Sequence, residues 1–521
     1  MIRYDKQGQP CLPGFEQFFG VPLDKENRWI KLSEVIPWDE FADAYYQNMS
    51  SGMGRPAKDA RLVIGAVIIK HKLCLGDEET IEQIRENPYL QYFVGLPAFQ
   101  TEPPFAPSLF VDIRRRMGDQ VFDRFNQAIV NRLNSRVRKG NDNVDPPASP
   151  ANQKDVEGPK KPCTKDTSHC GKLIVDATVA EQAIRFPTDL GLLNEARQIS
   201  EELIDTLYPL SGLQKKPRTY RRKARKAFLA LAKQRKATIN KRRRAIRQQL
   251  QYLKRNLGHI DMLLDLVADE NTALTFYQRR QYWIIQHVYR QQEEMFRTRT
   301  HRCDHRIVSI SQPHVRPIIR GKTGKAVEFG AKLSVSLTAE RLAHVDHLGW
   351  ESFHEGHDLP SQVESYKDRH GHYPEVVIAD TLYGSRANRK YLAARGIRFA
   401  GKSLGRPKKE TIDNRQHLRA DARRRRAEYR ERIPIEGKFG QGKNGYRLNY
   451  IRARTKATSE AWIRSIFLVM NLLVLAGTFF APLKKALSHS YSVIKDHFIY
   501  ICHLAKASAL PAMAFANVPP L

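Results

Sequence analysis

The sequence predicts an α/β core, a helical N-terminal domain before it and a basic helical insertion within it. Two short apolar segments that are typical of strands end in an aspartate, one at Asp176 and one at Asp380. The second is followed by a helical segment and a further strand. Between the two aspartates, from Thr206 to Ile260, the chain carries no acidic residue. The core is therefore expected to be split by a separate, positively charged helical segment.

Length and charge limit the class of protein. The chain has 521 residues, enough for two or three domains with a substantial core. It carries 87 Lys and Arg against 55 Asp and Glu, a formal charge of +32. A polyanionic partner explains this excess, and nucleic acid is the commonest one, although a basic but unrelated enzyme is the alternative. The N-terminus, Met1 to Asp5, has no apolar secretory region, so we expect a cytoplasmic, nucleoid-associated protein.

The N-terminal region, residues 1–135, has the signals of short helices. One helix is expected from Gly54 to before Gly76, and Asp77 is positioned to cap the next, which ends before Pro88. Such a pair is compatible with a helix-turn-helix, a weak signal because many helical domains contain one. Arg114, Arg115 and Arg116 follow as a basic cluster that either contacts phosphates or forms a solvated helix face. Residues 136–170 are proline-rich and polar, which predicts a flexible linker.

The segment Lys172 to Thr178 predicts a buried strand that presents Asp176 at its end. Taken alone, an aspartate after an apolar run is more often a cap or turn residue. After it comes the basic insertion, with 18 Lys and Arg between Lys215 and Arg255. Apolar residues at four-, three- and four-residue spacing from Ile246 to Leu257 indicate an amphipathic helix there. The insertion is expected to clamp DNA backbone, or else to be an exposed basic helix pair without a specific role. Its central arginines, Arg242, Arg243 and Arg244, are the DNA contacts we predict.

The sheet is expected to resume with strands at 306–310 and 327–337. A strand-helix-strand unit over 374–400 then predicts two parallel strands, so that Asp380 can converge with a carboxylate on a neighbouring strand. Between these segments, His354, Glu355, His357 and Asp358 are all possible metal ligands. Their spacing does not match HExxH, so a separate metal site is not expected.

The stretch from Tyr429 to Lys443 is the centre of the functional hypothesis. Pro434 suits a first helical turn, and a helix starting there would place Glu436 and Lys443 on one face, about 10 Å apart. Four glycines between 437 and 445 oppose helix formation, so tertiary packing or DNA must support it. The apolar run from Ile466 to Ala481 is short for a membrane span and predicts a buried core helix instead.

Tyr429, Arg432, Glu436 and Lys443 are separated by two, three and six residues, a spacing that resembles the signature of bacterial insertion-sequence transposases of the DDE type. The segment Ala379 to Arg389 is similar to the second-Asp motif of that family. The resemblance covers roughly residues 20–480. It implies an RNase H-like core, a mixed sheet flanked by helices, in which Asp176, Asp380 and Glu436 are catalytic and bind two Mg²⁺ or Mn²⁺ ions.

The resemblance also implies a domain organisation. Residues 1–135 would form a helical domain that binds DNA ends, and 136–170 a linker. Residues 171–482 would form the catalytic domain, with the basic insertion at about 196–300, and 483–521 a tail.

The activity that the resemblance implies is cleavage of insertion-sequence ends and joining of the 3′-OH to target DNA. Tyr429, Arg432 and Lys443 would contact the DNA ends. The partners would be double-stranded DNA, both terminal inverted repeats and target, and a second copy of the chain on that DNA, with no membrane. Two alternatives remain open: an RNase H-like nuclease without strand transfer, and a non-catalytic DNA-binding protein derived from a transposase.

Overall fold

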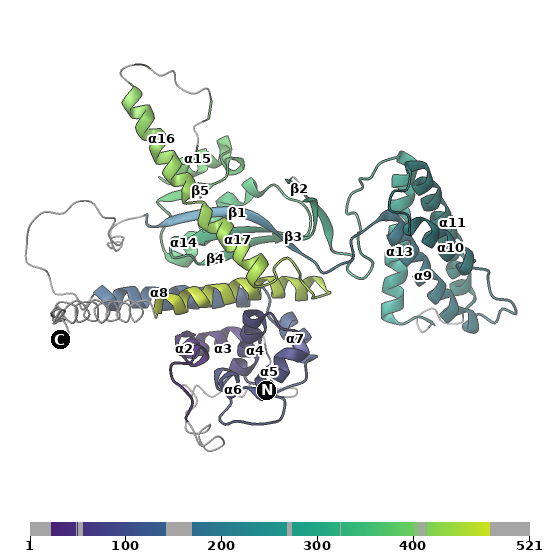
Figure 1. The fold of residues 1–521 in the computed structure, drawn as a ribbon, viewed down its shortest axis with the longest axis horizontal. Coiled ribbons are helices and arrows are strands. Elements are labelled where there is room, and N and C mark those ends of the chain that lie inside the picture. Colours follow the sequence, from purple (N-terminus) through teal and green to yellow (C-terminus); the bar gives the residue numbers. More distant parts are fainter. Residues whose placement is uncertain are drawn as a thin grey trace, which may run out of the picture.

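The computed structural model describes residues 22–47, 49, 56–141, 169–267, 273–322, 325–401, 404–405, 411 and 414–479. Figure 1 shows a central sheet with helices around it, a helical N-terminal domain on one side and a helical bundle that projects at one end. The expected linker lies largely outside the described residues, and the expected tail at 483–521 lies wholly outside them.

The N-terminal domain is a compact group of short helices. Asp59 caps α4 through its side chain, and nearly the whole of α4 is buried because helices surround it. Asp77 does not cap α5 as expected: it is the first residue of the helix, and its carboxylate instead pairs with Lys70 and Arg114. The helices are α2 (Arg28–Val35), α3 (Trp38–Tyr46), α4 (Ala60–Leu73), α5 (Asp77–Glu86), α6 (Pro88–Phe93), α7 (Leu109–Arg116) and the long α8 (Asp119–Asn141).

The core is a six-stranded mixed sheet in the order β2-β3-β1-β5-β6, with β4 also paired to β3. The central β1 is antiparallel to β3 on one side and parallel to β5 on the other, and β5 is parallel to β6. The parallel pair predicted for the strand-helix-strand unit is thus confirmed. The strands are β1 (Lys172–Glu181), β2 (Arg316–Lys322), β3 (Lys325–Thr338), β4 (Ala343–Gly349), β5 (Val376–Ala379) and β6 (Arg398–Ala400).

Helices cover both faces of this sheet. One face packs on α14 (Leu359–His370) and α15 (Arg386–Ala394) through a cluster that includes Val175, Val377 and Tyr366. The other face packs on α17 (Ile433–Gly445) and on the helix Lys456–Phe479, which we call the C-terminal helix. α16 (Arg415–Arg430) precedes α17 and projects from the core (Figure 1).

The C-terminal helix is a core element. Among the described residues it is the one helix long and apolar enough to cross a membrane, yet 61% of its most apolar window is buried inside the protein. It runs beside α8, where Arg464 pairs with Asp119 at 2.7 Å and Asn471 donates to Asn126 at 3.1 Å (Figure 1). This burial agrees with the predicted core helix.

The insertion between β1 and β2 is a helical bundle with its own apolar core. Leu253, Leu257 and Ile260 of α11 pack against Leu193 and Ile204 of α9, which explains the amphipathic period of the sequence. The helices are α9 (Asp189–Leu207), the 3-10 turn η1 (Tyr208–Leu210), α10 (Arg221–Ala232), α11 (Ile239–Leu266) and α13 (Phe276–Thr298).

Two strand predictions need correction. Residues 306–310 form no strand; the segment is irregular, and its apolar side chains Ile307 and Ile310 pack on the bundle core. The first strand does not end at Asp176 but continues to Glu181, because β3 pairs with it along its whole length.

Candidate active site

Asp176 lies on β1, and Asp380 directly follows β5, the parallel neighbour of β1. Val175 of β1 is opposite Ala379 of β5, and the next residue along each chain is the aspartate. β5 ends there, and the chain enters the 3-10 turn η3 (Thr381–Tyr383). The Asp380 carboxylate accepts from the backbone N–H of Thr381 at 2.6 Å, and Asp176 accepts from that of Ala177 at 2.9 Å. Parallel pairing therefore brings the two aspartates together at the point where β5 ends.

Glu436 comes to the same point from α17, where Arg432 links it to Asp380. The helix forms despite its glycines because Pro434 lies in its first turn and Ile435 and Phe439 are buried against the sheet. The Glu436 side chain remains 52% exposed. The helix expected at this position is thus present, and tertiary packing supports it.

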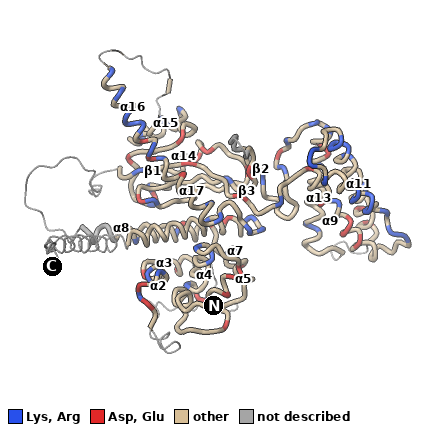
Figure 2. The backbone as a smooth tube through the Cα atoms, in the orientation of Figure 1, with Lys and Arg blue, Asp and Glu red and all other residues tan. Residues whose placement is uncertain are grey.

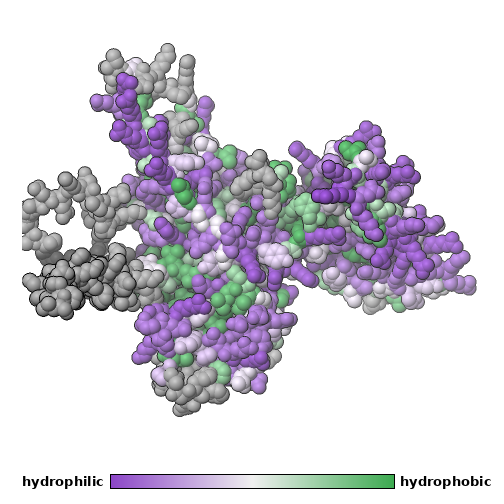
Figure 3. Space-filling model, in the orientation of Figure 1, coloured by the Kyte–Doolittle hydropathy of each residue, from purple (hydrophilic) through white to green (hydrophobic). Residues whose placement is uncertain are grey.

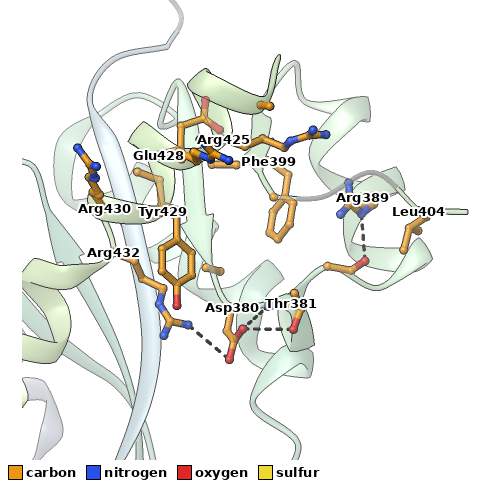
Figure 4. Close-up of a pocket in the computed structure, with 17 residues that line it drawn as sticks. Asp380, Thr381, Arg389, Phe399, Leu404, Arg425, Glu428, Tyr429, Arg430 and Arg432 are labelled. Carbon is orange, nitrogen blue, oxygen red and sulfur yellow. Dashed lines mark hydrogen bonds and ion pairs between the residues drawn. The ribbon is translucent and has the colours of Figure 1, made fainter. Parts of the chain in front are cut away.

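Arg432 connects the carboxylates. Its guanidinium lies 2.6 Å from Glu436 Oε1 and 3.4 Å from Asp380 Oδ2. Burial alone would lower the pKa of Arg432, but the hydrogen bond to Glu436 and the charges of Asp176, Asp380 and Glu436 raise it. Figure 4 shows Arg432 and Tyr429 directed toward Asp380. All three predicted carboxylates therefore act on one arginine.

Asp176 is a partly buried residue in the middle of β1. Burial raises its pKa, and the negative charges of Glu355 and Asp380 add to this effect. The hydrogen bond from Ala177 and the charge of Arg432 lower the pKa, but they do not cancel the increase. A carboxylate held among other carboxylates favours a nearby cation.

A cavity of about 710 Å³ lies beside Asp380, between η3, β6 and α16 (Figure 4). Phe399 and Tyr429 line it together with several arginines. The Arg389 guanidinium lies 4.8 Å from the centre of the Phe399 ring, and that of Arg432 lies 5.5 Å from the Tyr429 ring. Lys443 is further along α17, where its Nζ lies 3.7 Å from Glu328 Oε1.

The other predicted basic residues differ in exposure. Of the 18 Lys and Arg between Lys215 and Arg255, 17 are exposed, and Figures 2 and 3 show a basic, hydrophilic surface on the insertion. Arg242 and Arg244 belong to this surface, whereas Arg243 packs on Phe296 and donates to its carbonyl at 3.1 Å. Arg114 is neither a phosphate contact nor a solvated residue, because it is buried and paired with Asp77 at 2.9 and 3.0 Å.

Within the described residues no group of three or more His, Cys, Asp or Glu side chains has a spacing that would hold a metal ion. This finding covers His354, Glu355, His357 and Asp358, and it covers the triad Asp176, Asp380 and Glu436 as well. At the candidate active site, the Arg432 guanidinium lies between Asp380 and Glu436. The donors that Asp176, Asp380 and Glu436 offer are all carboxylate oxygens, which suit Mg²⁺ or Mn²⁺ rather than a softer metal.

Comparison with known proteins agrees with this arrangement. A family model described as "Transposase DDE domain" matches residues 377–473, which include Asp380 and Glu436. A second, described as "Transposase domain (DUF772)", matches residues 20–116, the region of α2 to α7. The "Uncharacterized protein ORF8 in nfe locus" of Rhizobium meliloti is 31% identical over 170 residues, which cover 33% of this chain and 69% of that protein. The chain belongs to the DDE transposase family.

No solved structure matches this DDE-family chain. The match to the DDE domain begins after Asp176, so the position of the first carboxylate depends on the strand pairing described above.

Sequence reasoning missed part of the surroundings of the carboxylates in this DDE-family protein. The charge of Glu355 contributes to the raised pKa of Asp176, whereas the sequence placed Glu355 only in a separate histidine-rich cluster. Lys172, at the start of β1, donates to both oxygens of Glu431 at 2.7 Å and so holds the junction of α16 and α17 against the sheet. No local pattern could reveal a pair 259 residues apart.

Proposed function

We propose that this protein is a DNA transposase that cleaves the ends of an insertion sequence and joins the freed 3′-OH to target DNA. The observation that supports this most is that Asp176 lies on β1 and Asp380 directly follows its parallel neighbour β5, with Glu436 linked to Asp380 through Arg432. Hydrolysis would break a phosphodiester bond and leave a 3′-OH. That hydroxyl would then displace the 3′ oxygen of a target phosphodiester, so the bond count is conserved and no external energy source is required.

Asp176, Asp380 and Glu436 would hold two divalent ions, Mg²⁺ or Mn²⁺. When bound, such ions activate the attacking water or hydroxyl and stabilise the leaving oxygen. The chain's own carboxylates supply the negative charge that attracts them, and Arg432 must change partners as they bind. The raised pKa of Asp176 is consistent with a carboxylate positioned for a cation.

The basic side chains would position DNA. Arg432 and Tyr429 lie beside Asp380, where they can contact the phosphates and the terminal nucleotide of an end. Lys443, two turns along α17 from Glu436, would contact a phosphate further along the strand. Arg242 and Arg244 of the insertion would bind the backbone outside the active site, and Arg243 would support them by anchoring α11 to α13.

We further propose that the core is RNase H-like. Support comes from the mixed sheet, whose central β1 has an antiparallel neighbour on one side and a parallel one on the other. We retain the division into a DNA-end-binding domain (1–135), a linker (136–170), a catalytic domain (171–482) with its insertion at about 196–300, and a tail (483–521). Because joining requires two paired ends, we propose a homodimer on DNA, in a cytoplasmic, nucleoid-associated protein.

Two alternatives make different predictions. A nuclease of the same fold would cleave without joining, and a DNA-binding derivative would do neither. All three carboxylates are present, which argues against a decayed site. The exposed basic surface of the insertion favours a protein that holds more DNA than a simple nuclease requires.

The test is cleavage and joining of a labelled DNA that carries the end of the element encoding this chain, with Mg²⁺ present. Wild type should give cleaved and joined products, and Asp380→Ala should give neither while still binding the DNA. Asp368→Ala is the matched control, because Asp368 is an exposed aspartate of the same domain on α14.

Cleavage without joining by wild type would favour the nuclease, and binding alone the DNA-binding derivative. Normal joining by Asp380→Ala would refute the assignment of the site.

A further inference from the structure

The helix α16, which leads into the helix of Glu436, carries a row of arginines along one side. They follow one another at intervals of four, four, three and four residues, and at that spacing the side chains of an α-helix lie on one face. The row extends over about 22 Å along the helix axis. All of its side chains are exposed. We call these residues the α16 arginine row: Arg415, Arg419, Arg423, Arg426 and Arg430.

The acidic residues of α16 do not neutralise this row. Asp421 and Glu428 lie on the opposite side of the helix, where Asp421 pairs with Arg424 at 2.8 Å and Glu428 pairs with Arg398 of β6. Within the described part of the chain, none of the last four arginines of the row has an ion pair or a hydrogen bond with an acidic side chain. The row is therefore a linear array of positive charge that fits a polyanion.

The row begins at the candidate active site and leads away from it. Arg426 and Arg430 line the cavity beside Asp380. Directly after α16, Glu431 accepts from Lys172 Nζ through both oxygens at 2.7 Å, which fixes this end of the helix to the sheet. The other end of α16 projects from the core, and its basic side chains project with it (Figures 1 and 2). A polyanion bound along the row would thus reach the carboxylates at one end.

The α16 arginine row is separate from the basic surface of the insertion. Figures 1 and 2 show α16 and the insertion projecting from the core in different directions, with the sheet between them. A protein that joins two DNA molecules at one set of carboxylates must hold the backbones of both. In the proposed function the N-terminal domain and the insertion hold the element end. The α16 arginine row is then available for the second duplex.

The chemistry of the row suits DNA of any sequence. Guanidinium groups bind phosphates through charge-assisted hydrogen bonds, and phosphate contacts position a duplex without reading its bases. An element end must be distinguished from other DNA, whereas a surface that contacts only the backbone can hold DNA that differs from one event to the next. We propose that the α16 arginine row binds the target DNA through its phosphates. The inference rests on the proposed function, because only a protein that joins ends requires a target.

The experiment measures cleavage and joining by the full chain in the same reaction. It uses Mg²⁺, a labelled DNA that carries the element end, and increasing amounts of a supercoiled plasmid as the target. Arg419→Ala/Arg423→Ala should cleave the end at the wild-type rate. The plasmid concentration that gives half-maximal joining should rise at least about tenfold, because two charge-assisted hydrogen bonds to phosphates are lost. Both side chains are exposed, so the fold should be unaffected.

Two control variants separate position from charge. Arg419→Lys/Arg423→Lys keeps both positive charges and should join ends to the plasmid nearly as wild type does. Arg386→Ala/Lys390→Ala removes the same charge from two exposed residues, also four apart, on the neighbouring α15. It should leave both cleavage and joining unchanged. An equal joining defect in this α15 variant would attribute the effect to net charge and would overturn the inference.

The remaining outcomes distinguish this inference from the proposed function. If wild type joins ends and Arg419→Ala/Arg423→Ala joins them equally well at every plasmid concentration, the target surface is refuted and the proposed function is not. Equal loss of cleavage and joining in that variant would show that the row holds the element end instead, which also overturns the inference. Cleavage without joining by wild type would overturn the proposed function, and the target surface with it.

Discussion

Lys438 shows what a single buried charge does in α17. It lies two residues from Glu436, is 7% exposed, and donates only long hydrogen bonds, at 3.4 and 3.5 Å, to the carbonyls of Arg341 and Met470. Burial, with a smaller contribution from Arg341, lowers its pKa to about 8. The unfolded chain takes up this proton near pH 10.5, so stability falls as pH decreases from about 10.5 to about 8 and is level below that.

We therefore expect Lys438→Met to raise the free energy of unfolding at pH 7 by up to about 3 kcal/mol. The gain should shrink as pH rises from 8 to 10, since wild type recovers its stability over that range. Urea unfolding at several pH values measures both effects. Lys390→Met, at an exposed position on α15, should show neither. A gain that does not depend on pH would mean that packing, not charge, is the cause.

For single residues, the sequence indicates which charged side chains are candidates for function, but it does not indicate which side chains they pair with. Glu436 stands out by the spacing of the Tyr429–Lys443 stretch and Asp380 by the motif around it, whereas Asp176 was selected through the family resemblance. Arg114 looked equally available for DNA, yet it is buried against Trp462, with its guanidinium 5.4 Å from the ring, and paired with Asp77. The ring comes from a helix near the other end of the chain, so no local window contains this information.

Among the elements, α11 carries the clearest consequence for DNA. Arg242 and Arg244 are exposed at its first turns, so each can neutralise a phosphate and release a counterion. Replacing both with alanine should reduce the slope of log affinity against log salt by roughly 2, without changing sequence preference. Fluorescence anisotropy with a duplex of random sequence, at salt concentrations from about 50 to about 200 mM, measures this slope.

The charge-preserving variant Arg242→Lys/Arg244→Lys is the control and should keep the wild-type slope. An unchanged slope in the alanine variant would remove these arginines from the DNA surface. Arg243→Ala should instead loosen the bundle, since Arg243 contacts Phe296 at 4.3 Å from the ring centre.

Elements were predictable where apolar spacing is strong, as in α11, β3 and the strand-helix-strand unit. Prediction was hardest for α17, where glycines at 437, 440, 442 and 445 oppose a helix. The helix is stabilised by the burial of Ile435 and Phe439. The strand predicted for residues 306–310 was wrong for the opposite reason, because there the local pattern favours a regular element that does not form. Its apolar residues look like a strand, but they pack on the insertion and find no strand to pair with. In both cases tertiary contacts override the local pattern.

In the whole molecule, the packing does not follow the expected domain boundary. One apolar cluster extends from Trp29 and Phe41 of the N-terminal helices, through the C-terminal helix, to Leu333 and Val335 of the sheet. The insertion alone has a separate core. The N-terminal domain and the sheet are therefore one packed unit. A DNA end bound by the first would be held at a fixed position relative to Asp380, which suits an enzyme that must cut at a set distance from its binding site.

Trp462 lies at the centre of that junction and provides its test. It is buried in the C-terminal helix, with Lys70 Nζ 4.6 Å from its ring centre and the His71 ring packed edge-on at 5.2 Å. Trp462→Ala should lower the free energy of unfolding by about 3 to 5 kcal/mol, because it leaves a cavity among buried charges. Trp283→Ala, at a ring 67% exposed on α13, should change it by less than about 0.5 kcal/mol. If the N-terminal domain packs as a single unit with the core, urea unfolding followed by probes in each should shift together in Trp462→Ala. Separate transitions in wild type would show instead that the two parts are independent.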